Sequence, residues 1–342
     1  MAAGAEACRL ANYGAANRRK APVFVLGCPR SGTTWLYHLL LSAGSFAMYH
    51  AESNVFNLLA PRFGSLRSAR DREELMAHWI RSGPFRASGL DAAAIRAKII
   101  AECRNAGDFL RITMQAIAES QGVERWADCT PDHLLHIPEI KRTIPDALVI
   151  HIIRDGRDVA LSYVKQGWAY PLRWDRGEQL SVAGLYWEWF VRRGREYGRM
   201  LGDDYQEVHF EELVAQPHET LARLSRFIGQ DLDYERIQQV GVGSVQEPNS
   251  SFPEESGEQF NPTGRWKTRM SAEEIDVFEN LCGEYLAQLG YPLASRNGRR
   301  RRNLHAWRMR TTYLLMFVAK QWCKTRTPLG RHIHIGRLLI EG

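Results

Sequence analysis

Three features that often define a protein class are missing from these 342 residues: a long apolar run, a closely spaced pair of cysteines and an internal repeat. No run reaches the ~18 apolar residues of a membrane-spanning helix, and the first 20 residues lack the apolar core of a signal peptide. The six cysteines are scattered without C-x-x-C spacing, which excludes the common zinc and disulfide frameworks. We therefore expect a reduced chain and a cytoplasmic location.

Acidic residues are scarce at the C-terminal end. Residues 296–342 hold twelve lysines or arginines and one acid, Glu341, a balance of +11 that leaves −5 for the rest of the chain. A mildly acidic body argues against nucleic acid as its main ligand. Residues 1–20 are small and polar and predict a flexible N-terminal arm. The chain thus divides into this arm, a body over 21–295 and a basic tail over 296–342.

The stretch from Val23 to Leu36 organises the body. An apolar run ends at Gly27, Gly27 and Gly32 bracket a short loop, and helical spacing of apolar residues begins at Thr33. A strand, a glycine-bracketed loop and a helix form a typical phosphate cradle, because loop N–H groups and the helix dipole point at one anion. The alternative is an ordinary glycine turn before a helix.

The loop differs from the phosphate loop of nucleoside triphosphatases, G-x-x-x-x-G-K-[ST], because Thr33 stands where that motif has lysine and the cation is Arg30 instead. This arrangement is poorly suited to clamping a triphosphate with magnesium. The stretch closely resembles the 5′-phosphosulfate loop of sulfotransferases, which use 3′-phosphoadenosine-5′-phosphosulfate (PAPS). The resemblance implies that the phosphosulfate is held by Arg30, Ser31, Gly32, Thr33 and Thr34.

A second motif follows the clearest predicted strand, residues 147–153. Arg154 ends this strand, and Ser162 lies about two turns into the next predicted helix. A guanidinium group with a hydroxyl group suits a second, separate phosphate; the alternative is a surface ion pair of Arg154 with Asp155 or Asp158. The motif resembles the 3′-phosphate site of sulfotransferases, in which proline is common at the position of Gly156.

A third motif, Gly264, Arg265, Trp266 and Lys267, resembles the loop that closes over the nucleotide in cytosolic sulfotransferases. The Arg-Lys pair that precedes this loop in the family is absent, and Arg265 is a substitute cation. Trp35 matches the family's adenine-stacking tryptophan, although its position on the apolar stripe of the first helix fits a core residue equally well.

The catalytic base is expected after a second strand, predicted at 46–49. An acceptor must lose a proton during sulfuryl transfer, so a carboxylate or imidazole is needed. The resemblance to Golgi-type and bacterial sulfotransferases favours Glu52, with His50 as the alternative. Cys129 stands where the family usually has lysine, which leaves Arg30 and Lys267 to stabilise the leaving phosphate.

Strands alternating with helices predict an α/β fold with a central parallel sheet flanked by helices, like that of P-loop-containing nucleoside triphosphate hydrolases. Residues 61–90 are interpreted as a mobile surface insertion with a helix near 72–81, and Gly107 as the break between two helices. The expected strands are 23–26, 46–49, 126–129, 147–153 and 205–209, and the longest expected helices are 178–200, 217–228 and 271–289.

The resemblance covers roughly 21–290 and implies sulfuryl transfer from PAPS to a hydroxyl or amine, with release of adenosine 3′,5′-bisphosphate (PAP) and without a metal. The acceptor is expected to be a small molecule, a sugar or a lipid headgroup. The alternatives are a P-loop nucleotide kinase and a non-catalytic, membrane-associated nucleotide-binding protein. Residues 299–322 either bind an anionic membrane surface or pack on the body. Their apolar stripe is Leu304, Trp307, Thr311, Leu314, Leu315, Val318 and Trp322.

Overall fold

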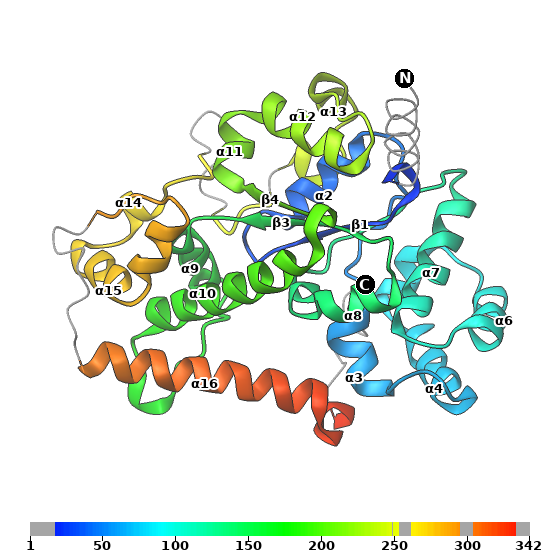
Figure 1. Ribbon diagram of the computed structural model, residues 1–342, viewed down its shortest axis with the longest axis horizontal. Coiled ribbons are helices and arrows are strands. Elements are labelled where there is room, and N and C mark those ends of the chain that lie inside the picture. Colours follow the sequence, from blue (N-terminus) through cyan, green and yellow to red (C-terminus); the bar gives the residue numbers. More distant parts are fainter. Residues whose placement is uncertain (1–17, 248, 253–260, 295–303, 333–342) are drawn as a thin grey trace, which may run out of the picture.

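A sheet of four parallel strands forms the centre of the protein (Figure 1). The computed structural model describes residues 18–247, 249–252, 261–294 and 304–332. The basic run 299–302 and most of the predicted N-terminal arm therefore lie outside the described residues. The strand order is β2-β1-β3-β4, and every neighbouring pair is parallel. The strands are β1 (Val23–Leu26), β2 (Ala127–Asp128), β3 (Leu148–Ile153) and β4 (Tyr205–His209).

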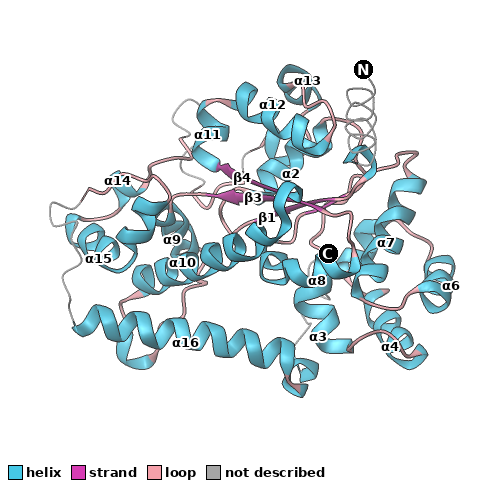
Figure 2. Ribbon diagram, viewed as in Figure 1, coloured by secondary structure: helices cyan, strands magenta, loops and turns pink. Residues whose placement is uncertain are grey.

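Helices cover both faces of the sheet, which confirms the predicted fold class (Figure 2). Alternate residues of β1 face opposite cores: Val23 and Val25 pack in one, and Phe24 and Leu26 in the other. Because both faces are buried, the strands are continuous apolar runs.

Helices separate successive strands along the chain, as the crossover connections of a parallel sheet require. On one side of the sheet lie α2 (Thr33–Ser42), α11 (Phe210–Ala215), α12 (Pro217–Ile228) and α13 (Tyr234–Val240). The others are α3 (Ala60–Phe63), α4 (Ala69–Trp79), α5 (Gly83–Ser88), α6 (Ala92–Glu102), α7 (Ala106–Ser120), α8 (Ile137–Thr143), α9 (Gly156–Lys165), α10 (Gln179–Gly198), α14 (Trp266–Arg269), α15 (Ala272–Gln288) and α16 (Leu304–Arg326).

The strand order brings the two predicted phosphate motifs to one edge of the sheet. β1 pairs with β3 in register, with Leu26 opposite His151, so the loops after both strands leave the sheet side by side. A Cβ atom on Gly27 would lie 2.5 Å from the carbonyl oxygen of Ile152, which explains why glycine begins the loop. The chain runs from β1 to β2 on one side and to β3 on the other, and ligands of parallel sheets bind at such a reversal.

The predicted strand at 46–49 is wrong. Phe46 makes a single bridge to Arg125, and the chain then continues as a loop. The backbone N–H of Met48 donates to the side-chain carbonyl of Gln121, whose amide group donates back to the carbonyl oxygen of Met48. A side-chain amide therefore satisfies the backbone groups that a neighbouring strand would have bound.

The interpretation of residues 61–90 as a mobile insertion is also wrong. Serine side chains cap α4 and α5, and Leu75, Met76 and Trp79 are buried in the main core. The predicted break at Gly107 is misplaced as well, since this residue lies in the first turn of α7.

The C-terminal helix α16 packs on the body, mainly against α10 and along the lower edge of the molecule in Figure 1. Its buried residues are Ala306, Met309, Tyr313 and Phe317. The predicted apolar stripe occupies a different face of the helix, and five of its members are exposed: Leu304, Trp307, Leu315, Val318 and Trp322.

Ion pairs to buried carboxylates hold α16 in place. Both terminal nitrogens of Arg310 lie 2.8 Å from the carboxylate oxygens of Glu188, which is buried in α10. Arg308 pairs in the same way with buried Asp175, whose carboxylate also accepts a hydrogen bond from the hydroxyl group of Tyr313. These contacts fix which face of α16 meets the body.

Replacement of Arg310 by alanine should lower the free energy of unfolding by about 1–3 kcal/mol, because a buried carboxylate loses two of its hydrogen bonds and keeps only Arg192. Urea denaturation followed by circular dichroism measures the change. Arg326→Ala, which alters an exposed position of the same helix, should stay within about 0.5 kcal/mol of the wild type. Equal losses in both variants would contradict this role of Arg310.

Candidate functional site

The loop between β1 and α2 has a backbone conformation that depends on positive φ angles. Arg30 and Gly32 both have positive φ, 74° and 91°. A Cβ atom on Gly32 would lie 2.4 Å from a ring carbon of Phe210, so no larger residue fits there. The hydroxyl group of Ser31 is buried and makes no hydrogen bond to any described residue. Together with the uncapped first turn of α2, it is a donor set for an anion.

Arg154 connects the two motifs. One terminal nitrogen of its buried guanidinium group donates to the carbonyl oxygen of Arg30 at 3.0 Å, and the other donates to the carbonyl oxygen of Pro262. The group lies 4.5 Å from the ring centroid of Phe210, and its Nε atom has no hydrogen-bond acceptor among the described residues. Arg154 is thus in the interior of the site, not in a surface ion pair.

Arg30 reaches across to the second motif. Its Nε atom donates to the hydroxyl group of Ser162 at 2.9 Å, and a terminal nitrogen donates to that of Ser251 at 2.7 Å. Ser162 and Ser251 also contact each other at 2.8 Å. The sequence analysis missed Ser251, because it lies in a long loop without a local motif.

The electrostatics of this cluster favour an anion. Burial lowers the pKa of Arg30, and the charge of Arg154 lowers it further. Burial also lowers the pKa of Arg154, an effect that nearby Asp158 and Glu211 oppose. The half-buried guanidinium group of Arg30 and the buried one of Arg154 repel each other and are stabilised when a phosphate or sulfate group lies between them.

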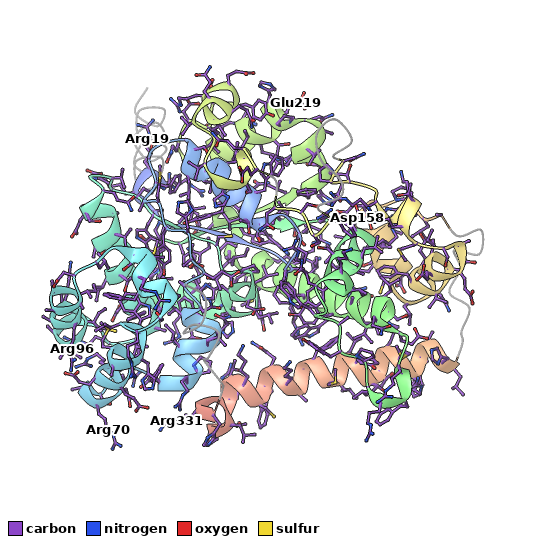
Figure 3. All side chains as sticks on the ribbon, turned by 180° about the vertical axis from the view of Figure 1, so that it is seen from behind. Arg19, Arg70, Arg96, Asp158, Glu219 and Arg331 are labelled. Atoms are coloured by element: carbon purple, nitrogen blue, oxygen red, sulfur yellow. The ribbon has the colours of Figure 1, made fainter. Side chains whose placement is uncertain are left out.

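Asp158 fastens the third motif to the site. Its two carboxylate oxygens accept hydrogen bonds from the backbone N–H groups of Gly264, at 2.7 Å, and Trp266, at 2.9 Å. Asp158 belongs to α9, and in Figure 3 it lies inward from the outline of the molecule, whereas Arg70 lies at the rim. Trp266 is buried under the guanidinium group of Arg157, 3.6 Å from its ring centroid, and Lys267 is exposed.

A cavity of about 380 Å³, here called the Trp35 cavity, opens beside these groups. Trp35 lies in its wall, half-buried, with its ring edge-on to Phe210 at 5.7 Å. Five of the predicted residues are not among its lining residues: Ser31, Ser162, Gly264, Trp266 and Lys267. The predicted residues that do line it are Arg30, Gly32, Thr33, Thr34, Trp35, Arg154 and Arg265.

A second cavity of about 380 Å³, here called the Glu52 cavity, lies on the other side of the phosphate loop. Pro29 of that loop and Glu52, an exposed residue, both line it, so Glu52 borders a space that begins at the loop. His50 is exposed and lines neither cavity; its ring is 5.8 Å from that of His38.

A buried hydrogen-bond network anchors the segment that carries Glu52. The carboxylate of Asp128 accepts hydrogen bonds from the hydroxyl group of Ser53, from the backbone and side chain of Thr130 and from His133. His133 in turn accepts from the backbone N–H of Phe56 at 3.2 Å. Burial opposes ionisation of Asp128, but these hydrogen bonds outweigh it and hold the pKa of its carboxyl group below the ordinary value. The network therefore anchors the backbone next to Glu52 through Ser53.

Cys129 occupies the position of the usual family lysine and supplies no charge there. Burial raises the pKa of its thiol, and the negative charge of Glu52 raises it further. A thiol in this environment stays protonated and is neither a nucleophile nor a cation. Within the described residues, no group of three His, Cys, Asp or Glu side chains is arranged to hold a metal ion.

Comparisons with known proteins concern the family and the fold of the chain. A sulfotransferase family profile matches residues 22–234, more than half of the chain. The sulfotransferase domain of an olefin synthase from Synechococcus PCC 7002 is 20% identical, with a TM-score of 0.51, over 80% of this chain and 95% of that one. The sulfotransferase domain of the curacin biosynthetic pathway is 16% identical (TM-score 0.49, 80% and 98% covered). A mouse sulfotransferase in complex with PAP is also 16% identical (TM-score 0.42, 82% and 88% covered).

Replacement of Arg154 by alanine should weaken PAP binding by about 30- to 150-fold, which corresponds to the loss of a charge-assisted contact of about 2–3 kcal/mol. Calorimetric titration in EDTA measures the affinity and shows at the same time that the wild type needs no metal. Arg70→Ala removes an equal charge from the rim and should leave the affinity unchanged. Equal PAP affinity in the wild type and Arg154→Ala would remove Arg154 from the binding site.

Proposed function

The chain belongs to the sulfotransferase family, and we propose that its sulfuryl donor is PAPS, bound in the Trp35 cavity without a metal. The observation that carries the proposal is the pair of unsatisfied buried groups, the hydroxyl group of Ser31 and the Nε atom of Arg154. Ser31 follows Arg30 in the chain, Arg154 donates to the carbonyl oxygen of Arg30, and the two groups belong to two different loops. A nucleotide with separate 5′ and 3′ phosphates explains both groups, whereas a single phosphate explains one.

The 5′-phosphosulfate and the 3′-phosphate of the donor fit different groups of residues. The 5′-phosphosulfate fits the phosphate loop, where Ser31, Gly32, Thr33 and Thr34 present N–H and hydroxyl groups at the start of α2. The 3′-phosphate fits the cluster of Arg154, Ser162 and Arg265. The adenine fits between Trp35 and the apolar residues of α11–α13, such as Leu213 and Tyr234, that complete the cavity wall.

The reaction follows from the position of Glu52. The acceptor's hydroxyl oxygen or amine nitrogen attacks the sulfur atom from the Glu52 cavity and forms the new bond to sulfur. The bond between sulfur and the phosphate oxygen breaks, and its electron pair leaves with PAP. Glu52 takes the proton of the acceptor. Arg30 and the first turn of α2 stabilise the charge on the departing phosphate.

Two alternatives remain distinguishable by experiment. A P-loop nucleotide kinase needs magnesium to neutralise its phosphates, so phosphoryl transfer from ATP that EDTA abolishes would favour it. Thr33 in place of lysine argues against this alternative. A non-catalytic nucleotide-binding protein would bind PAP and release no sulfated product from labelled PAPS.

Replacement of Glu52 by glutamine should lower kcat by about 10²–10⁴ because the amide cannot accept the proton of the acceptor. PAP affinity should stay unchanged, since Glu52 does not line the Trp35 cavity. The matched variant is His50→Ala, which should keep near-normal turnover. An inactive His50→Ala with an active Glu52→Gln would identify His50 as the base, and activity in both would place the base elsewhere.

We further propose that the protein lies in the cytoplasm, at an anionic membrane surface. Among the described helices, none is long and apolar enough to cross a bilayer. The exposed stripe of α16 instead suits the interface, because its tryptophans, Trp307 and Trp322, are 66% and 59% exposed. Basic residues flank it: the run 299–302 precedes the helix in the sequence, and Arg326 ends it.

Replacement of both Trp307 and Trp322 by serine should reduce pelleting with phosphatidylserine-containing vesicles by about 10-fold or more, because burial of two aromatic side chains at the interface is lost. Co-sedimentation measures it. Met200→Ser changes an exposed apolar residue outside α16 and should pellet like the wild type. If the double variant pellets normally, the stripe does not bind membranes.

A further inference from the structure

The last described helix supplies one wall of the Glu52 cavity. Met316, Phe317, Lys320, Gln321 and Lys324 lie on successive turns of α16 and line the cavity opposite the phosphate loop. The family match ends at residue 234, so this wall is formed by a segment that lies outside the matched region. The α16 wall of the cavity is therefore formed by residues that the family profile does not include.

The middle of the cavity is aromatic. The rings of Tyr163 and Tyr186 are 5.3 Å apart, and Phe317 of α16 meets Tyr186 at 5.3 Å and Trp189 at 5.6 Å. These side chains line the wall between the phosphate loop and α16. An apolar or ring-shaped molecular body packs well on such a surface.

Two lysines line the cavity on the α16 side. Lys320 and Lys324 are one helical turn apart, and neither forms a hydrogen bond or an ion pair with a residue that the structure describes. Burial lowers the pKa of Lys324, Asp132 opposes this effect and Lys320 adds to it. Like charges at this spacing destabilise a helix, and a half-buried ammonium group lacks part of its hydration. An anionic group between the two lysines would relieve both penalties.

Two carboxylates also line the cavity, and one of them, Asp132, is close enough to Lys324 to raise its pKa against the effect of burial. Glu52 and Asp132 line it together with Pro29 of the phosphate loop. One oxygen of Asp132 accepts a hydrogen bond from the side chain of Asn57 at 3.4 Å, which orients it near the loop. The cavity thus combines the carboxylate-bearing residues Glu52 and Asp132, a cluster of aromatic rings and two lysines of α16.

We propose that the acceptor is an amphiphilic organic anion. Its hydroxyl or amine group meets Glu52, its apolar or aromatic body packs on Tyr163, Tyr186 and Phe317, and its carboxylate, sulfate or phosphate group binds Lys320 and Lys324. This proposal rests on the proposed sulfotransferase function and adds the substrate class. Contacts with α16 determine which acceptors the enzyme uses, and the donor site does not contribute to this choice.

The test compares a para-hydroxyphenyl alkanoate with its methyl ester as acceptors at saturating PAPS, using the full-length protein. The two probes share the nucleophile and the apolar body and differ only in the anionic group. The wild type should prefer the acid by about 10-fold or more in kcat/KM, mainly through KM, as a charge-assisted contact implies.

The double variant Lys320→Met, Lys324→Met should lose this preference, while its rate with the ester and its PAP affinity stay within about twofold of the wild type. A misfolded variant would lose the preference for the acid, the rate with the ester and the PAP affinity together. Arg70→Met, an exposed change of equal chemistry in α4, should keep the preference of the wild type.

Equal use of acid and ester by the wild type overturns the proposal, and so does a preference that survives in the double variant. Both results leave the sulfotransferase function intact, because product still forms. Absence of any labelled product from PAPS, together with absence of PAP binding, would overturn the proposed function instead.

Discussion

The hydrogen bond from Arg154 to the carbonyl oxygen of Arg30 is the contact on which the site depends. β1 and β3 are neighbouring parallel strands, so their loops leave the sheet together, and this bond fixes the distance between them. Arg30, held at a positive φ, turns its guanidinium group away from its own loop and toward Ser162. The two motifs are thus linked by direct hydrogen bonds and form one positively charged cluster.

Much of this arrangement could be predicted, because its determinants are local in the sequence. A strand buried on both faces is a continuous apolar run, and the residues that end two such strands of a parallel sheet must meet at one edge. Arg30 and Arg154 were identified in this way. Ser251 was not, because its place beside Arg30 depends on a distant loop that returns to the site. The strand predicted at 46–49 fails for a related reason, since a distant glutamine, Gln121, takes its backbone hydrogen bonds.

The C-terminal helix shows a second limit. α16 carries apolar residues on two faces, and helical spacing alone identifies both without ranking them. The buried face is chosen by partners far away in the sequence: Glu188 pairs with Arg310, and Asp175 pairs with Arg308. Neither pairing has a local signal. The packing of α16 on the body was one of two open alternatives, but the residues that make the contact were not foreseen.

α16 packs on the body and also borders the Glu52 cavity, whereas the Trp35 cavity is lined by residues of the sheet edge, α2 and α11–α13. The proposed sites for acceptor and donor therefore rest on separate parts of the chain. Substitutions along one face of α16 can then change which acceptors the enzyme uses, while the residues proposed to bind the nucleotide stay the same. Such a division lets one scaffold diversify through its C-terminal segment, and comparison of acceptors among homologues should track this helix more closely than the phosphate loops.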